Sequence, residues 1–141
     1  MTTLKAQITL LLALAMLILT ATAAYGAAPE PCKVLSAEAW GSIMGYTATA
    51  TPGDMNCTYQ SKSGGGQFRI IAVAESTAVA EAGAKRLRDM EPKDSPMAWR
   101  GGVYSKGSVV FSIALFQHAA TADTASQLQK LVAAAKQNLP K

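Results

Sequence analysis

Cys32 and Cys57 are the two cysteines of the chain, and thiols are its most reactive side chains. In an oxidising compartment, two thiols in one small domain most simply form a disulfide. The competing interpretations are a metal-binding pair and a reactive thiol nucleophile. The chain has a single histidine and no Cys-x-x-Cys spacing, which leaves too few ligands for a zinc site. We therefore predict a structural Cys32–Cys57 disulfide, with no metal site and no cofactor.

His118 is that single histidine, and it could serve as the general acid of a small secreted nuclease. Arg69, Glu75 and Arg100 would be its partners on one face of a sheet. Such an enzyme also has to stack a base, and aromatic residues make up only 6% of the chain. The serines form no Gly-x-Ser-x-Gly or Ser-x-x-Lys pattern, and no acidic pair has glycosidase-like spacing. We expect a protein that is not an enzyme, with the nuclease as an alternative.

A long connection between predicted elements, Glu91–Gly102, holds the strongest candidates for binding. It contains Met97, Trp99 and Arg100. Long irregular connections are often functional, and tryptophan and arginine are enriched at binding hot spots. The alternative is that Trp99 folds back over the sheet as a lid on the core.

Further binding candidates lie on the predicted strands. A sheet backed by helices leaves one face free, and Arg69, Ile71 and Val73 are predicted to lie on it. Tyr104, which follows the long connection, completes the predicted binding residues. They would hold an unknown protein or small ligand.

The first 28 residues have the three-part layout of a secretory signal peptide. Lys5 precedes the apolar run Ile8–Leu19, and the small-residue stretch Thr20–Ala28 follows. The run is shorter than the roughly 20 apolar residues needed to span a bilayer, and no cysteine near the cleavage point could carry a lipid. We predict cleavage between residues 23 and 28, no stable membrane anchor afterwards, and one secreted or periplasmic domain over residues 29–141.

The charge distribution argues against nucleic acid as a partner. The chain has 13 Lys and Arg against 9 Asp and Glu, a formal net charge of +4. The densest basic cluster is Lys85, Arg86 and Arg88, and Glu81 and Asp89 stand at helical spacing from Lys85. Nucleic-acid binders usually carry a larger basic face, so this cluster indicates a solvated helix surface.

The first part of the domain is predicted as a helix, a loop and a strand. Ser36 is a good N-cap and Gly45 suits the left-handed residue after a helix, so these residues bound the helix. Tyr46–Asp54 is predicted as a loop that turns at Pro52-Gly53. Met55–Ser61 has the alternation of a strand.

Three consecutive glycines, Gly64 to Gly66, follow that strand and precede the strand Gln67–Glu75. They could form a phosphate cradle, but no Gly-Lys-Ser/Thr follows and no helix begins there. We therefore predict the flexible tip of a β-hairpin.

The second half repeats the order of helix, strand and strand. A helix is predicted from Ser76 or Thr77 to Met90, with Val79, Gly83, Leu87 and Met90 on one face. Val103–Lys106 and Val109–Gln117 form the second predicted hairpin, with its turn at Lys106-Gly107-Ser108. Val109–Gln117 is apolar on both faces and should be covered on both sides. A final helix begins at Thr121 or Asp123 and ends near Leu139.

The elements together predict an α+β domain of order α-β-β-α-β-β-α. It would have a four-stranded antiparallel sheet, helices packed on one face and one disulfide. An ancient αββ duplication would explain why the two hairpins look alike.

Three stretches resemble a group of small bacterial exported and lipoprotein domains of unknown function. They are Pro31–Glu38, Cys57-Thr58-Tyr59 and Ala98–Gly107. The resemblance implies an αββ-type sheet domain and the Cys32–Cys57 bond, and it supplies no activity. The resulting functional prediction is a secreted or periplasmic, non-catalytic binding or protein-interaction module. The alternatives are an exported inhibitor or immunity-type protein, and the nuclease.

Overall fold

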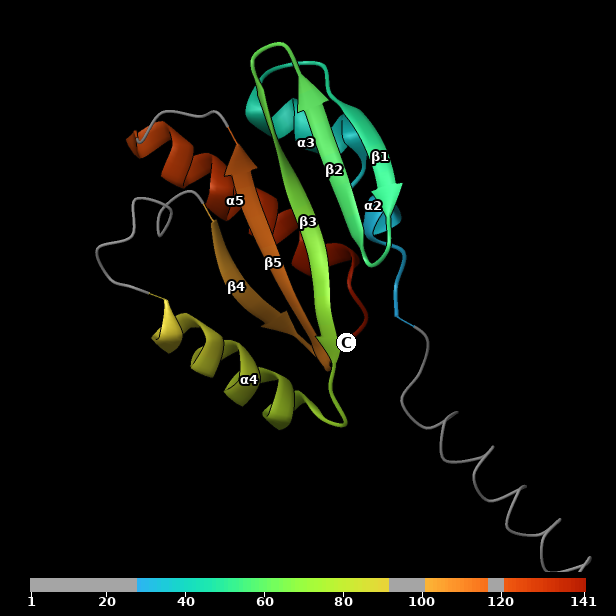
Figure 1. Cartoon of the computed structure of the whole chain (residues 1–141), viewed down its shortest axis with the longest axis vertical. Coiled ribbons are helices and arrows are strands. Elements are labelled where there is room, and N and C mark those ends of the chain that lie inside the picture. Colours follow the sequence, from blue (N-terminus) through green and yellow to red (C-terminus); the bar gives the residue numbers. More distant parts are fainter. Residues whose placement is uncertain (1–27, 92–100, 117–120) are drawn as a thin grey trace, which may run out of the picture.

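The computed structural model describes residues 28–91, 101–116 and 121–141 as an α+β fold around one antiparallel sheet (Figure 1). The sheet has five strands in the order β1-β2-β3-β5-β4. The strands are β1 Thr49–Gly53, β2 Asn56–Ser61, β3 Gly64–Val73, β4 Gly101–Lys106 and β5 Val109–Phe116. The described residues also form four helices, which are α2 Pro31–Val34, α3 Ala37–Met44, α4 Thr77–Met90 and α5 Ala122–Asn138.

The predicted four-stranded sheet is wrong by one strand, because the predicted loop Tyr46–Asp54 contains β1. Pro52-Gly53 does not make the turn but ends this strand. The turn is Asp54-Met55, where Met55 has a positive φ of 58°. Proline lacks an N–H and is tolerated in an edge strand such as β1, where one side of the backbone has no partner strand. The short helix α2 was not predicted either.

The helix ends follow the local signals in the sequence. The side chains of Ser36, Ser76 and Thr121 accept hydrogen bonds from backbone N–H groups of the first turns of α3, α4 and α5. Gly45 ends α3 with φ 81°, the left-handed conformation that glycine adopts without strain. These predicted caps are confirmed.

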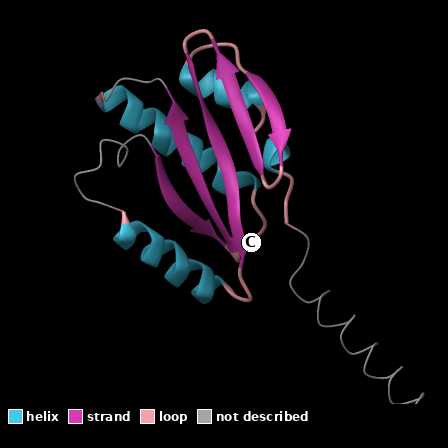
Figure 2. Ribbon diagram, in the orientation of Figure 1, coloured by secondary structure: helices cyan, strands magenta, loops and turns pink. Residues whose placement is uncertain are grey.

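The main core lies on the face of the sheet covered by α2, α3 and α5 (Figure 2). Trp40 of α3 stacks on Tyr59 of β2, with ring centroids 4.0 Å apart and an interplanar angle of 7°. The Tyr59 hydroxyl donates a hydrogen bond to the Leu35 carbonyl oxygen. The Cys32–Cys57 disulfide joins α2 to β2, as predicted. Together these contacts hold the front of the domain on the first hairpin.

The three glycines are buried in β3 and are not a flexible tip. The turn before them is Lys62-Ser63. A Cβ atom on Gly66 would lie 2.4 Å from the Trp40 ring and 2.4 Å from the Ala114 carbonyl oxygen. The Trp40 ring therefore packs directly on Gly66, in space that a side chain would fill. This contact is between residues distant in the sequence, so the local sequence does not indicate it.

Helix α4 packs on the opposite face, so the prediction that all helices share one face is wrong. Its buried residues, Ala80 and Ala84, contact Val103 of β4 and Val110 of β5. The apolar outer side of β5 needs this cover, and the prediction that β5 is covered on both sides is confirmed there. The predicted apolar face of α4 is largely exposed, and Met90 is 70% accessible.

Candidate functional site

The side of the sheet opposite the main core is only partly covered. Within the described residues, α4 packs over β4 and β5, and no helix packs on this side of β1, β2 and β3 (Figure 1). We call this uncovered area the open face. Its outward side chains include Thr49, Thr51, Asn56, Thr58, Gln60, Gln67, Arg69, Ile71, Ser112, Ala114 and Phe116.

Strand register places the polar side chains of the open face in rows. Arg69 of β3 pairs with Asn56 of β2 on one side and with Ser112 of β5 on the other. Directly opposite residues in antiparallel strands have Cβ atoms about 4.5–5.5 Å apart, so these three side chains are neighbours. In the next row, the Gln67 amide nitrogen donates to the Thr58 hydroxyl over 3.4 Å. The open face thus offers hydroxyl, amide and guanidinium groups next to each other.

A β-bulge between Ile70 and Ala72 limits the open face at one end. Arg69 and Ile71 are exposed, as predicted for the free face. Val73 packs against the main core instead, because the extra residue of the bulge reverses the alternation of the strand. The prediction for Val73 is therefore wrong.

Tyr104 lies on the other side of the sheet from Arg69. Its ring is partly buried against the main core, and its centroid is 5.7 Å from that of Phe111. Burial raises the pKa of the Tyr104 phenol, and its side-chain hydrogen bond with Gln129 of α5 acts in the opposite direction. A single binding site cannot contain both Arg69 and Tyr104. Met97, Trp99, Arg100 and His118 lie outside the described residues.

A hollow of about 430 Å³ lies on the open face beside Phe116. The Phe116 side chain is 41% accessible, and its strand partner on β3 is Gly65. A Cβ on Gly65 would lie 2.3 Å from the Tyr59 carbonyl oxygen, so glycine allows β3 to pass close to β2 at this point. The hollow is completed by residues of β2 and the start of β3, and the described residues that line it are all uncharged. The lining residues are Thr58, Tyr59, Gln60, Ser61, Gly64, Gly65 and Phe116.

Sequence reasoning did not single out this hollow. The sequence predicts that Val109–Gln117 is apolar on both faces, but it does not give the strand partner of Phe116. The pairing of Phe116 with Gly65 joins two residues far apart in the sequence. Three glycines before an apolar strand were the available signal, because glycine in a strand often marks a place that something approaches closely.

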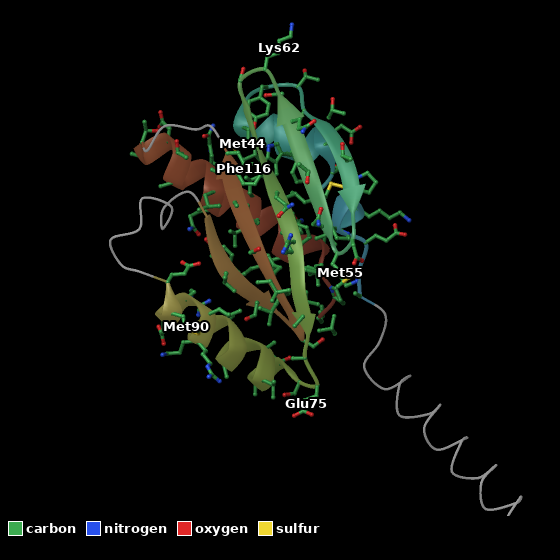
Figure 3. All side chains as sticks on the ribbon, in the orientation of Figure 1. Met44, Met55, Lys62, Glu75, Met90 and Phe116 are labelled. Carbon is green, nitrogen blue, oxygen red and sulfur yellow. A yellow bond between two sulfur atoms is a disulfide. The ribbon has the colours of Figure 1, made fainter. Side chains whose placement is uncertain are left out.

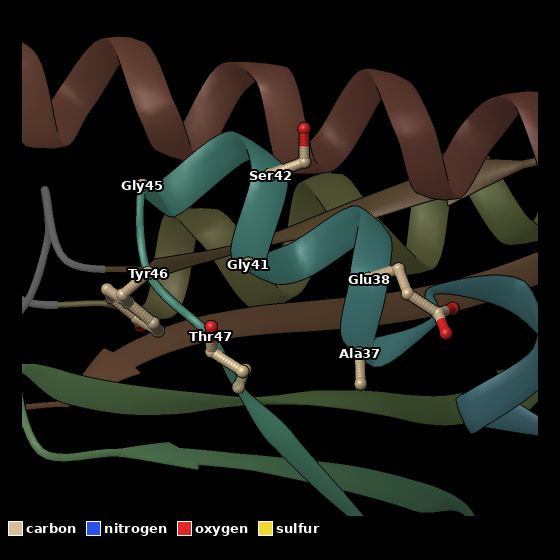
Figure 4. Close-up of a pocket in the computed structure, with 8 residues that line it drawn as sticks. Ala37, Glu38, Gly41, Ser42, Gly45, Tyr46 and Thr47 are labelled. Atoms are coloured by element: carbon tan, nitrogen blue, oxygen red, sulfur yellow. The ribbon is translucent and has the colours of Figure 1, made fainter.

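A larger hollow of about 660 Å³ lies beside α3 (Figure 4). Ala37, Gly41 and Gly45 form a stripe of small residues along it. A Cβ on Gly41 would lie 2.3 Å from the Tyr46 carbonyl oxygen, so this glycine allows the chain to return closely along the helix. Backbone packing explains the small residues here.

Two residues of the basic cluster of α4, Lys85 and Arg88, make intramolecular contacts. Lys85 forms an exposed ion pair with Asp89 over 2.6 Å, as predicted from their spacing. The Arg88 guanidinium donates to the Val103 carbonyl oxygen over 2.9 Å. In the ladder that begins at the closing pair Lys106 and Val109, Val103 is in a non-hydrogen-bonded pair, so its carbonyl faces the free edge of β4. Arg88 therefore covers part of that edge.

The described residues form no group of three or more His, Cys, Asp or Glu side chains that could hold a metal ion. Both cysteine thiols are used in the disulfide, so neither is available as a nucleophile. No helix within residues 28–91, 101–116 and 121–141 is long and apolar enough to cross a membrane.

These features define an α+β domain with a five-stranded antiparallel sheet, one disulfide and a partly uncovered sheet face. The disulfide indicates an oxidising, extracytoplasmic environment. No protein-family model, no curated protein and no solved structure matches the chain.

Proposed function

We propose that this protein is a secreted or periplasmic, non-catalytic binding module that holds its ligand on the open face. The observation that carries the proposal is the row of Asn56, Arg69 and Ser112 on a part of the sheet that no described helix covers. Arg69 forms no ion pair with the other described residues. A guanidinium between an amide and a hydroxyl can bind carbonyl, carboxylate or hydroxyl oxygens of a ligand.

The open face also contributes little to the fold, which supports a role in binding. Its side chains make one long hydrogen bond, between Gln67 and Thr58, and one bond to a turn, from the Asn56 amide to the Asp54 carbonyl oxygen. The aromatic stacking and the disulfide lie elsewhere. Substitutions there should change binding with little change in stability, because exposed side chains away from special features usually contribute within about 0.5 kcal/mol.

The test maps ligand binding by NMR. The ¹⁵N-labelled domain from residue 29 onward, in its oxidised form, is titrated with separated protein and polysaccharide fractions of a bacterial envelope extract. The proposal expects at least one fraction to shift amide signals of β1, β2, β3 and β5. The shifts should disappear in Arg69→Ala but remain in Arg86→Ala, which removes an exposed arginine of α4. Shifts confined to other elements, or no shifts with any fraction, would contradict the proposal.

Export is tested separately by mass spectrometry of the protein produced from the full sequence. The expected mature species begins after a residue between 23 and 28 and contains no free thiol. A full-length protein with two free thiols would contradict the extracytoplasmic assignment.

A further inference from the structure

The hollow beside Phe116 has the composition of a site for an uncharged polar ligand with an apolar side. None of the described residues that line it is charged, so they offer no partner to compensate the desolvation of an ionic ligand. Its volume of about 430 Å³ lies within the range of about 300–1,000 Å³ typical of small-molecule sites.

The ring of Phe116 is the apolar wall of this hollow. Phe116 is at the end of β5 (Figure 3) and is 41% accessible, although its neighbour Leu115 is fully buried in the main core on the other side. An exposed aromatic face carries a partial negative charge that attracts the polarised C–H bonds of a ring stacked on it. Gly65 of β3 is the strand partner of Phe116 and lines the hollow together with it.

Hydrogen-bonding groups lie along the β2 side of the hollow. The Gln60 side chain is exposed and has no hydrogen-bond partner within the described residues, so its amide can both donate to and accept from a ligand. The Thr58 hydroxyl accepts from Gln67 and still has a proton to donate. The Ser61 hydroxyl is already used, since it donates to the Gly64 carbonyl and accepts from the Ser63 N–H.

We propose that this hollow is a subsite for a neutral saccharide, with one sugar ring stacked on Phe116 and its hydroxyl groups hydrogen-bonded to Gln60 and Thr58. A pyranose ring combines the two required properties, because its C–H groups form an apolar side while hydroxyls surround its rim. An apolar peptide side chain would use the ring but leave the Gln60 amide and the Thr58 hydroxyl without partners from the ligand. The inference rests on the proposed function and specifies the ligand class of the open face.

The experiment titrates the ¹⁵N-labelled oxidised domain with cellotetraose, with N-acetylated chitotetraose and with maltotetraose, each up to 10 mM. The expected result is saturable binding of at least one of them, with amide shifts at Gly64, Gly65 and Phe116. Phe116→Ala should weaken that binding at least tenfold, and Phe116→Trp should retain it. Gln60→Ala should weaken it a fewfold.

Ile71→Ala is the matched control, because Ile71 is 40% accessible and lies on β3 toward the other end of the open face. It should bind the saccharide as the wild type does. Thermal unfolding of each variant shows that the fold is kept, since all three altered side chains are exposed. Absence of binding by all three saccharides, or binding that Phe116→Ala leaves unchanged, would overturn the inference. Binding of an Ala-Leu-Phe-Ala peptide in place of the saccharides would also overturn the inference. If that peptide shifted amide signals of the open face, the proposed binding function would still hold.

Discussion

The contact between Gly66 and Trp40 makes a quantitative prediction about stability. A Cβ atom at position 66 would lie 2.4 Å from two atoms that cannot easily move, the Trp40 ring and the Ala114 carbonyl oxygen. The ring is held by its stacking on Tyr59 and by the hydrogen bond that its indole N–H donates to the Tyr46 hydroxyl. Overpacking a core costs about 1–3 kcal/mol. Because both neighbours are fixed, we expect Gly66→Ala to lower the free energy of unfolding by about 3 kcal/mol.

Gly83→Ala is the matched control, because it makes the same chemical change in α4. No atom lies within 4 Å of a Cβ built at Gly83, and the residue is inside a helix. Alanine is favoured over glycine in a helix by about 1 kcal/mol, so this variant should be more stable than the wild type. The same substitution should thus have opposite effects at two positions.

The assay is urea unfolding of the oxidised domain, followed by circular dichroism and checked by thermal unfolding. A loss of about 3 kcal/mol in a domain of this size corresponds to a fall in Tm of about 12 °C. Trp40→Phe, made in both backgrounds, separates the ring contact from other effects. Gly66→Ala should cost at least about 1 kcal/mol less when the smaller ring is present. The reasoning would be refuted if Gly66→Ala stayed within about 0.5 kcal/mol of the wild type, or if the two substitutions were additive.

Three further predictions concern the disulfide, a strand edge and a buried tyrosine. Reduction of Cys32–Cys57, whose sequence separation is 25, should cost about 3.5 kcal/mol by loop entropy, and an unchanged urea midpoint in reductant would contradict it. Arg88→Ala should uncover the edge of β4 and increase self-association in light scattering, whereas Arg86→Ala should not; equal behaviour would count against the edge contact. Burial raises the pKa of the Tyr59 phenol above its ordinary 10.0, so stability is complete below pH 10 and falls as pH rises toward the folded-state pKa. Tyr59→Phe should decline less steeply above pH 10 in urea titrations, by up to about 1.4 kcal/mol per pH unit, and a parallel decline would contradict this.

Features set by neighbouring residues could be predicted from the sequence. Ser36 and Gly45 bound α3 because each acts on backbone groups within one turn of its own position. The turn at Gly107, with φ 55°, follows equally from two-residue hairpin chemistry. The disulfide could be predicted because two cysteines in an oxidising compartment allow one intramolecular pairing.

Features set by distant residues could not be predicted. The edge strand β1 was not predicted because Pro52-Gly53 is a strong turn signal. In the structure, Pro52 instead pairs with Cys57 of β2 and continues the strand. The open face was predicted in part, since Arg69 lies on it. Tyr104 was also predicted as a binding residue, but its pairing with Phe111 directs its side chain toward the main core, and the sequence does not give this register. The hollow depends on the pairing of Phe116 across two hairpins, which periodicity within one strand cannot supply.

The two faces of the sheet differ in how strongly the fold depends on their side chains. On the core side, Trp40 packs directly on Gly66, and a disulfide joins Cys32 to Cys57 of β2. Substitution of these residues should therefore destabilise the fold. On the open face, Gln60 and Phe116 are exposed, so substitutions there should leave the fold intact. Because the core side fixes the register that places Phe116 opposite Gly65, the shape of the hollow depends on the core side. The ligand specificity that we propose for the hollow depends instead on exposed side chains, which are expected to contribute little to stability.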